Sequence, residues 1–286
     1  MNHIACVLPT IRPEKQKTFC KAWKRLFALH DVELLTVYDG KNPILEHGKY
    51  RYTVEDVMGK KNIDLIYNFH GGVGNLGIAY IAKCMPQVDR ILFLNDDEEP
   101  IGDTIQDHLD ALDRKFPISW FNTASEYMRG FPYAVRNEAE CVFSHGVWRG
   151  VADWDAPTQL VVGNKPVEFY RGPVPKGIYT PISAMNIAFK REALPYVYMA
   201  PNSFAIGRAD DIFMGINLVR ACEKHNWAIA SGYAMVKHER ASNVFNNLKK
   251  EAPFIDLNET YWSGEEQHPY FKEYAIKRKR WEAFTK

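Results

Sequence analysis

Short apolar runs alternate with amphipathic segments through the first 120 residues, and this order restricts the fold more than any other feature of the sequence. Four apolar or β-branched runs predict buried strands: residues 4–9, 32–38, 63–67 and 90–94. Three segments with apolar side chains at helical spacing predict helices: residues 14–29, 77–85 and 105–116. Strands that alternate with helices predict an α/β fold with a mainly parallel sheet flanked by helices.

The second half of the chain is less regular. Proline and glycine are frequent between residues 131 and 181, where we expect mostly loops. Further on, residues 193–197, 211–224 and 270–286 have helical patterns, and residues 229–236 have a strand pattern. The sequence shows no repeat, low-complexity segment or obvious linker. We therefore expect a single domain with an elaborated C-terminal half.

Composition excludes several classes of protein. The 36 Lys and Arg residues balance 35 Asp and Glu residues, so a generally basic nucleic-acid coat is not expected. Apolar runs are far shorter than the roughly 20 residues that span a bilayer, and no signal peptide is visible. The five cysteines form no CxxC pair, which argues against a zinc ribbon and favours reduced thiols in a cytoplasmic protein.

A glycine motif, GxGxxG, occupies residues 72–77, between a predicted strand and a predicted helix. With Asp96 nineteen residues beyond Gly77, it resembles a dinucleotide-binding fingerprint. Two other predicted strands precede the strand that leads into this motif, however, and Asp96 belongs to a run of four carboxylates. NAD binding is therefore the less favoured interpretation, and the glycines could instead begin a helix beside a bound nucleotide.

An acidic segment follows the predicted strand at residues 90–94. Asn95, Asp96, Asp97 and Glu98 would lie at the edge where open α/β sheets bind ligands. Neighbouring carboxylates repel one another, and a divalent cation shared with diphosphate oxygens would relieve that repulsion. Asp97 is the preferred metal ligand, and Asp96 is expected to face the sugar or ribose. The alternative is a solvated acidic turn.

Two arginines lie seven residues apart in a segment with proline and aromatic residues. Guanidinium groups suit phosphate oxygens, so Arg129 and Arg136 are candidates to clamp a nucleotide sugar. The alternative is a pair of ordinary surface arginines.

Three further polar residues come from the second half. Asp210 and Asp211 precede a predicted helix, where Asp211 could cap the helix and Asp210 could act as a base or hold a sugar hydroxyl. His238 follows a predicted strand, and it is a candidate metal ligand if the fold returns it to Asp97. A structural histidine is the alternative.

Three longer motifs carry a family resemblance: residues 129–132 (RGFP), 153–160 (DWDAPTQL) and 243–251 (NVFNNLKKE). They resemble the plant reversibly glycosylated polypeptides, the UDP-arabinopyranose mutases, and the similarity runs from residue 4 to about residue 251. The resemblance implies a GT-A-type, Rossmann-like fold. Residues 9–10, 39–40 and 75–77 also resemble GT-A glycosyltransferases in general.

The resemblance implies a role for each candidate residue. Thr10 and Asp39 would border the uridine. Asn95, Asp96 and Asp97 match three consecutive aspartates that hold metal and nucleotide, although the first is asparagine here. Arg129 and Arg136 match two arginines needed for activity or self-glycosylation; we prefer an electrostatic role, because protonated arginine is a weak nucleophile. Asp210 and Asp211 match an acidic pair, and His238 matches a C-terminal histidine.

These observations predict a UDP-sugar enzyme that uses Mn²⁺ or Mg²⁺ and interconverts the pyranose and furanose forms of UDP-arabinose. Residues 1–120 would bind the nucleotide, residues 121–260 the sugar or acceptor, and residues 261–286 would form a basic helix. The first alternative is sugar transfer to a glycan, a protein or a hydroxymethylated base in DNA, which the basic residues 277–280 suggest. The second, suggested by Asn95, is an inactive nucleotide-sugar-binding subunit in a homo- or hetero-oligomer.

Overall fold

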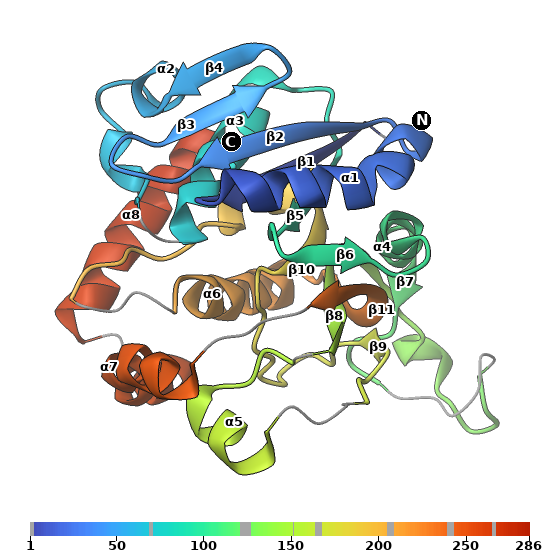
Figure 1. Cartoon of the computed structure of the whole chain (residues 1–286). Coiled ribbons are helices and arrows are strands. Elements are labelled where there is room, and N and C mark those ends of the chain that lie inside the picture. Colours follow the sequence, from blue (N-terminus) through green and yellow to red (C-terminus); the bar gives the residue numbers. More distant parts are fainter. Residues whose placement is uncertain are drawn as a thin grey trace.

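A single mixed sheet organises the chain in the computed structural model, which describes residues 3–68, 71–120, 127–150, 152–163, 168–204, 209–238, 243–264 and 267–286 (Figure 1). Its strand order is β4-β3-β2-β1-β5-β10-β8-β11-β6, with β7 paired to β8 and β9 paired to β11. The strands are β1 (Ile4–Thr10), β2 (Val32–Tyr38), β3 (Ile44–His47), β4 (Tyr50–Thr53), β5 (Arg90–Leu94), β6 (Glu98–Pro100), β7 (Lys115–Phe116), β8 (Ala139–Gly150), β9 (Gly172–Pro173), β10 (Asn186–Lys190) and β11 (Ala228–His238).

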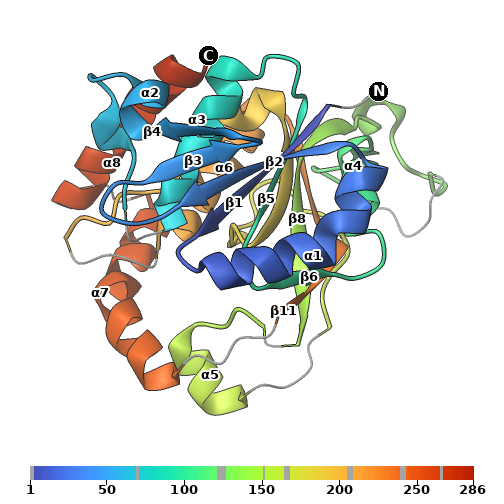
Figure 2. The ribbon, with the colours of Figure 1, turned by 45° about the horizontal axis from the view of Figure 1, so that its top comes forward.

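Helices cover both faces of this sheet, as the alternating pattern predicts (Figure 2). The α-helices are α1 (Pro13–Leu29), α2 (Val54–Met58), α3 (Asn75–Cys84), α4 (Thr104–Leu112), α5 (Ala156–Val162), α6 (Asp210–His225), α7 (Val244–Trp262) and α8 (Pro269–Thr285). Short 3₁₀ helices are η1 (Ile63–Leu65), η2 (Gly71–Gly74), η3 (Tyr133–Val135) and η4 (Arg191–Tyr196). The predicted α/β class, one sheet with flanking helices, is confirmed.

Pairing within the sheet is less parallel than the sequence predicts. The parallel pairs are β1 with β2, β1 with β5, and β8 with β11, and the remaining pairs are antiparallel. Two features account for this difference: β3 and β4 form a hairpin at one edge, and β10 runs antiparallel between β5 and β8. Parallel pairing is therefore concentrated where β1, β2 and β5 end together.

The helical pattern at residues 193–197 corresponds largely to the 3₁₀ helix η4. Two local expectations were wrong. Residues 63–67 include the 3₁₀ helix η1 instead of a strand, because only Leu65 of that helix is buried. The long strand β8 lies within the proline- and glycine-rich region where loops were expected, and residues 141–148 of β8 are buried on both faces.

Two apolar cores lie on opposite faces of the sheet. Phe19 and Trp23 of α1 pack with Leu109 of α4 on one face. The larger core, on the other face, gathers buried side chains of α3, α6 and α8, such as Leu76, Phe213 and Trp281. This core draws on all three predicted parts of the chain, whose boundaries stay a prediction.

The basic face of α8 is largely engaged within the chain. Lys277 and Arg280 form ion pairs with Asp64, at 3.9 and 2.7 Å. Arg278 donates to the side chain of Asn217. These cations dock α8 against neighbouring elements, so the feature that suggested a DNA acceptor has a structural explanation. Within the described part of the chain, no helix has the length and apolar character needed to cross a bilayer.

Candidate functional site

The carboxyl ends of three parallel strands meet at one edge of the sheet. Thr10 ends β1 opposite Tyr38, the last residue of β2, and β5 runs parallel to β1 on its other side. The Asp39 N–H donates to the Thr10 carbonyl oxygen at 2.8 Å. The segment of residues 95–97 directly follows β5 at the same edge. The predicted nucleotide-contacting residues Thr10, Asp39, Asn95 and Asp96 are therefore brought to the edge where open α/β sheets bind ligands.

Asp96 is the most tightly held carboxylate at this edge. Its side chain is only 4% exposed, and it accepts a 2.5 Å hydrogen bond from the Thr10 hydroxyl. The guanidinium group of Arg12 also donates to it, through Nε at 3.3 Å and through Nη2. Because both carboxylate oxygens are engaged, Asp96 is fixed in position by β1 and by the residue that precedes α1.

Asp97 is more accessible and shares the same arginine. Its side chain is 17% exposed, and Arg12 Nη2 lies 3.3 Å from its Oδ2. Desolvation acts to lower the pKa of Arg12, but the hydrogen bonds and charges of Asp96 and Asp97 raise the pKa overall. Sequence reasoning missed Arg12, although its place two residues after the end of a predicted strand is a usable signal.

Glu98 holds the acidic turn in place through two hydrogen bonds. Its Oε2 accepts the Asn95 N–H at 3.0 Å, and its carbonyl oxygen accepts the Trp23 indole N–H at 2.9 Å. Burial raises the pKa of the Glu98 carboxyl well above its usual range, and the charges of Asp97 and Asp153 add to the increase. The buried Oε1 has no hydrogen-bond partner among the described residues. Glu98 therefore shapes the turn that presents Asp96 and Asp97.

Asp210 and Asp211 form the first turn of α6. Asp211 accepts the Ala184 N–H at 3.1 Å and the Ile212 N–H at 2.9 Å. Burial, reinforced by the charges of Asp210 and Asp153, raises the pKa of Asp211 to about 7. The N-cap of α6 is Ala209, so Asp211 does not occupy the capping position that was the alternative for it. A carboxyl with this pKa can exchange a proton near neutral pH.

The glycine motif has a packing explanation. A Cβ atom on Gly77 would lie 2.6 Å from Val7 Cγ1, so glycine lets α3 approach β1 closely. One residue before the motif, a Cβ on Gly71 would lie 2.5 Å from Asp210 Oδ2. These glycines place η2 and α3 against the sheet and against the start of α6. Packing within the chain therefore accounts for glycine at positions 71 and 77.

Asp153, which sequence reasoning did not select, links the two acidic groups. Its charge raises the pKa of both Glu98 and Asp211, which places it near the turn after β5 and near the start of α6. Asp153 begins the motif at residues 153–160. The same motif contains Asp155, whose side chain caps α5 by accepting the Thr158 N–H at 2.9 Å.

The two long motifs contact each other. Glu251 Oε2 of α7 accepts the Ala156 N–H at the start of α5, at 2.7 Å. Glu251 is buried, and a carboxylate at a helix N-terminus is favoured by the helix dipole. Residues 153–160 and 243–251 therefore meet at this contact and hold α5 beside α7 (Figure 2).

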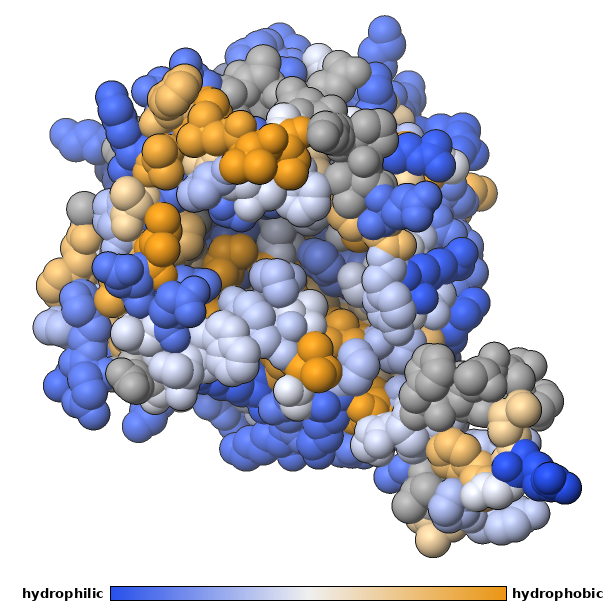
Figure 3. All heavy atoms as spheres, turned by 90° about the horizontal axis from the view of Figure 1, so that it is seen from below, coloured by the Kyte–Doolittle hydropathy of each residue, from blue (hydrophilic) through white to orange (hydrophobic). Residues whose placement is uncertain are grey.

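The segment with the two arginines belongs to a lobe that projects from the body of the molecule (Figures 1 and 3). Arg136 stacks on the rings of Tyr127 and Tyr133, at 4.3 and 3.8 Å from their centroids. It also donates to the Phe131 carbonyl oxygen at 3.0 Å, and Arg129 is exposed. The recorded contacts of Arg136 with described residues lie within this lobe, so the clamp on the nucleotide stays a prediction.

The fold brings His238 close to the acidic turn, as the predicted role of metal ligand requires. It ends β11, is buried, and pairs in register with Glu98 of β6. Even so, the described residues contain no group of three His, Cys, Asp or Glu side chains arranged to hold a metal ion. Asp96 and Asp97 are paired with Arg12 instead. As arranged here, these residues do not fit a divalent cation.

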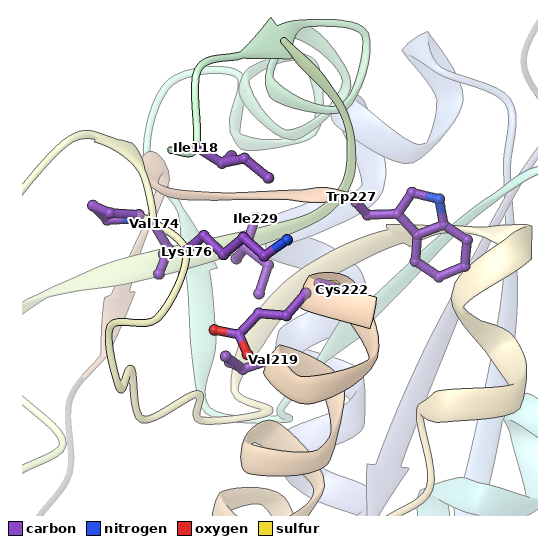
Figure 4. Close-up of a pocket in the computed structure, with 9 residues that line it drawn as sticks. Ile118, Val174, Lys176, Val219, Cys222, Trp227 and Ile229 are labelled. Atoms are coloured by element: carbon purple, nitrogen blue, oxygen red, sulfur yellow. The ribbon is translucent and has the colours of Figure 1, made fainter. Parts of the chain in front are cut away.

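Two pockets lie far from each other. One, of about 400 Å³ including its open mouth, is lined by Lys15, Asp96, Asp97 and Lys237. The other, of about 260 Å³, is mainly apolar and includes Ile229 near the start of β11 (Figure 4). His238 lies at the far end of the same strand, so the apolar pocket does not belong to the acidic edge. The face seen from below in Figure 3 is also hollowed at its centre.

The fold and site define an α/β protein with a cluster of carboxylates at the carboxyl edge of its sheet, two of which, Asp96 and Asp97, share Arg12. The chain belongs to the reversibly glycosylated polypeptide family, whose model matches residues 1–281. The resemblance noted in the sequence is confirmed.

Curated relatives include plant proteins named UDP-arabinopyranose mutases. Number 3 of Arabidopsis thaliana is 32% identical over 198 residues, which cover 63% of this chain and 52% of the relative. Number 2 of the same plant is 28% identical over 295 residues, which cover 95% of this chain and 78% of the relative. The alignment with the first therefore spans about half the length of that relative.

Solved structures give a weaker likeness. A197 from STIV has a TM-score of 0.39 with 12% identity, covering 84% of this chain and 86% of that chain. A Drosophila β1,4-galactosyltransferase 7 in complex with manganese, UDP-Gal and xylobiose has a TM-score of 0.37 with 11% identity, covering 84% and 71%. At these values the likeness carries no argument about this chain.

Proposed function

We propose that this protein binds a UDP-sugar at the acidic edge and interconverts the pyranose and furanose forms of UDP-arabinose. One observation supports this most directly. The structure brings Thr10, Asp39 and the Asp96–Asp97 pair to the same edge of the sheet. Membership of the reversibly glycosylated polypeptide family, and relatives named as mutases, support the choice of sugar.

In this proposal two groups of residues at the edge of the sheet bind different parts of the substrate. Thr10 and Asp39 border the uridine at the ends of β1 and β2, while Asp210 and Asp211 face the sugar from the start of α6. Arg129 and Arg136 would approach the diphosphate and stabilise its charge as it leaves. The involvement of Mn²⁺ or Mg²⁺ is an expectation from the resemblance alone, and we route no step through a metal.

Ring interconversion breaks two bonds at the anomeric carbon, forms two and transfers one proton. The bond from the anomeric carbon to the diphosphate breaks, and its electron pair leaves with UDP. A different sugar hydroxyl then attacks the electron-poor anomeric carbon and loses its proton, and the bond from this carbon to the former ring oxygen breaks as that oxygen gains a proton. A diphosphate oxygen finally attacks the anomeric carbon again. Asp211, with a pKa of about 7, is suited to accept and return that proton.

The test is to incubate UDP-arabinopyranose and other UDP-pentoses with the protein and separate the products by chromatography. A furanose product, strongly reduced in Asp211→Asn and retained in Asp256→Asn on the exposed side of α7, is the expected result. If no UDP-pentose yields a furanose, the proposal is wrong. Calorimetry of UDP binding would then show whether the chain is an inactive binding subunit, and release of UDP only with an added hydroxyl acceptor would indicate a transferase.

A further inference from the structure

The two consecutive aspartates of the acidic turn already have a cation from the chain itself. Asp96 accepts hydrogen bonds from Arg12 Nε at 3.3 Å, from Arg12 Nη2 and from the Thr10 hydroxyl. Three of the roughly four lone-pair sites of this carboxylate are therefore in use. Arg12 Nη2 also lies 3.3 Å from Asp97 Oδ2. The arginine thus supplies positive charge to the carboxylates that a divalent ion would otherwise have to bridge.

The surroundings of these aspartates are less negative than the acidic sequence suggests. The turn begins with the neutral Asn95, whose N–H donates to the buried Glu98 side chain at 3.0 Å. Lys15 and Lys237 line the pocket beside the aspartates, and Lys237 lies 3.9 Å from Glu99. Protein cations therefore stand on the same pocket as the carboxylates, and they offset the repulsion that an incoming anion would meet there.

One side of the Arg12 guanidinium group is open. A guanidinium has five N–H donors in a planar fork, and the bonds to the two aspartates use only Nε and Nη2. No partner of Nη1 is recorded within the described ranges, and 43% of the Arg12 side chain is exposed. Planar guanidinium groups match the oxygens of phosphates. Arg12 is therefore held in position by Asp96 on one side and can donate to a phosphate on the other.

Arg12 also lies at the part of the edge where we place the nucleotide. It comes two residues after Thr10, which ends β1, and it is the N-cap residue of the 17-residue helix α1. Phosphates commonly bind outside the carboxyl ends of parallel strands, close to the first turn of the helix that follows. Position and free hydrogen-bond donors therefore both favour an anion beside Arg12.

We propose that Arg12 donates from Nη1 to the diphosphate of UDP, and that UDP binding at this edge does not depend on a divalent metal ion. Asp96 holds the guanidinium group in place, and Asp97 shares Nη2 with it. The arginine then takes the role that the acidic sequence assigns to Mn²⁺ or Mg²⁺. This inference rests on the proposed function only in taking UDP as the nucleotide that binds here.

The test is calorimetric titration of the full chain with UDP, once in EDTA and once with Mn²⁺. The affinity of the parent chain should differ by less than about threefold between the two conditions. In EDTA, Arg12→Gln should bind UDP about 10- to 100-fold more weakly, the loss expected for one hydrogen bond between charged groups. Arg12→Lys, which keeps the charge without the fork, should lie between the two.

The matched control is Arg25→Gln. Arg25 is exposed on the same helix, about 20 Å further along its axis, so its loss should change UDP affinity less than about twofold. Uridine, measured by its displacement of UDP, separates a phosphate contact from a general effect on the edge. Because uridine has no phosphate, its affinity should change less than about twofold in Arg12→Gln. Circular dichroism verifies that each variant is folded.

Four results would overturn this inference. The first is UDP binding by the parent chain that EDTA abolishes, or no UDP binding in either condition. The second is unchanged UDP affinity in folded Arg12→Gln. The third is an equal loss of UDP and uridine affinity in that variant, which would mean that Arg12 only shapes the edge, and the fourth is an equal loss in Arg25→Gln.

The two proposals can fail separately. UDP binding in EDTA without any furanose product would leave the role of Arg12 intact and contradict the mutase activity. A furanose product that forms only when Mn²⁺ is added, with UDP binding that also requires Mn²⁺, would do the reverse.

Discussion

The molecule contains two polar clusters in which pKa values shift in opposite directions. The acidic edge contains six carboxyl side chains at the carboxyl end of the sheet: Asp96, Asp97, Glu98, Asp153, Asp210 and Asp211. Within the sheet, His108 Nδ1 lies 2.8 Å from the Ser144 hydroxyl and Nε2 lies 2.9 Å from Asn186 Oδ1. Nearby, His145 lies 3.1 Å from the Ser231 hydroxyl. We refer to these five residues as the buried histidine network.

The difference lies in which protonation state each cluster favours. Burial lowers the pKa of both His108 and His145 to about 4, so the network is neutral near pH 7. The acidic edge instead forces carboxylates together, and the pKa of Asp211 rises to about 7. Neutral, paired groups are typical of architecture, whereas crowded carboxylates that cost stability are typical of a functional site. Substitutions should therefore affect activity at the edge and stability in the network.

The largest expected effect is on activity at the edge. Replacing Asp97 with alanine should reduce turnover of UDP-arabinopyranose by about 100-fold, because Arg12 loses one of its two carboxylate partners and the edge proposed to position the substrate is disturbed. The melting temperature should change little, because Asp97 is partly exposed and its recorded partner is Arg12. Initial rates and thermal melts of Asp97→Ala would test this, with Glu99→Ala in the next strand as the control. Loss of stability in proportion to activity would contradict it.

The next effect concerns acid sensitivity of the network. The pKa of His108 is lowered by burial, so the folded state resists protonation that the unfolded chain accepts below about pH 6.5. Stability is therefore present above the unfolded pKa and is lost as pH falls toward 4. The effect of this histidine should lower the free energy of unfolding by about 2 to 3 kcal/mol between pH 7 and pH 4.5.

Urea unfolding at several pH values would measure that loss. His108→Gln should remove this share of the pH dependence, while His3→Gln, at an exposed position, should behave as the parent chain does. Equal acid losses in the parent chain and His108→Gln would show that the network does not control acid sensitivity.

The acidic edge should give a pH dependence of opposite sign. Because the pKa of Asp211 is raised, the stability that this carboxyl contributes is fully present below its unfolded pKa. That stability is lost as pH rises through about 7. Asp211→Asn should therefore become more stable than the parent chain as pH rises from 4 to 8, by about 2 kcal/mol once the charge shared with Asp210 is discounted. Asp256→Asn serves as the control. A gain that does not vary with pH would rule out this explanation.

The smallest effect is expected away from both clusters. Glu251→Gln removes the charge from the 2.7 Å hydrogen bond to the Ala156 N–H at the start of α5. A carboxylate at a helix N-terminus contributes about 1 kcal/mol, so unfolding free energy should fall by about that amount with activity nearly unchanged. Glu259→Gln, on the exposed side of the same helix, should have no measurable effect.

The sequence was most informative where local pattern and topology agree. The positions of Thr10, Asp39 and Asp96 follow from the rule that parallel strands end together, so the edge was predictable without coordinates. The contact between Arg12 and Asp97 was not, because these residues are 85 positions apart. The ion pairs that hold α8 could not be predicted for the same reason, since the partner of Arg280 lies 216 residues earlier in the chain.

Strand β8 illustrates another limit. Its polar residues Ser144 and His145 interrupt the apolar pattern, and both are bonded within the buried histidine network, which no local pattern reveals. The structure likewise places Arg136 among aromatic rings, a contact that spacing alone did not indicate.

Two of the attachments of the acidic turn come from helix α1 and its N-cap. Arg12 is its N-cap residue, and the indole of Trp23, three turns further on, holds the Glu98 carbonyl. A slide of this one helix along the sheet would pull on the turn from two directions at once. Any substitution or bound molecule that reshapes the acidic edge must therefore also accommodate the position of α1 on the sheet.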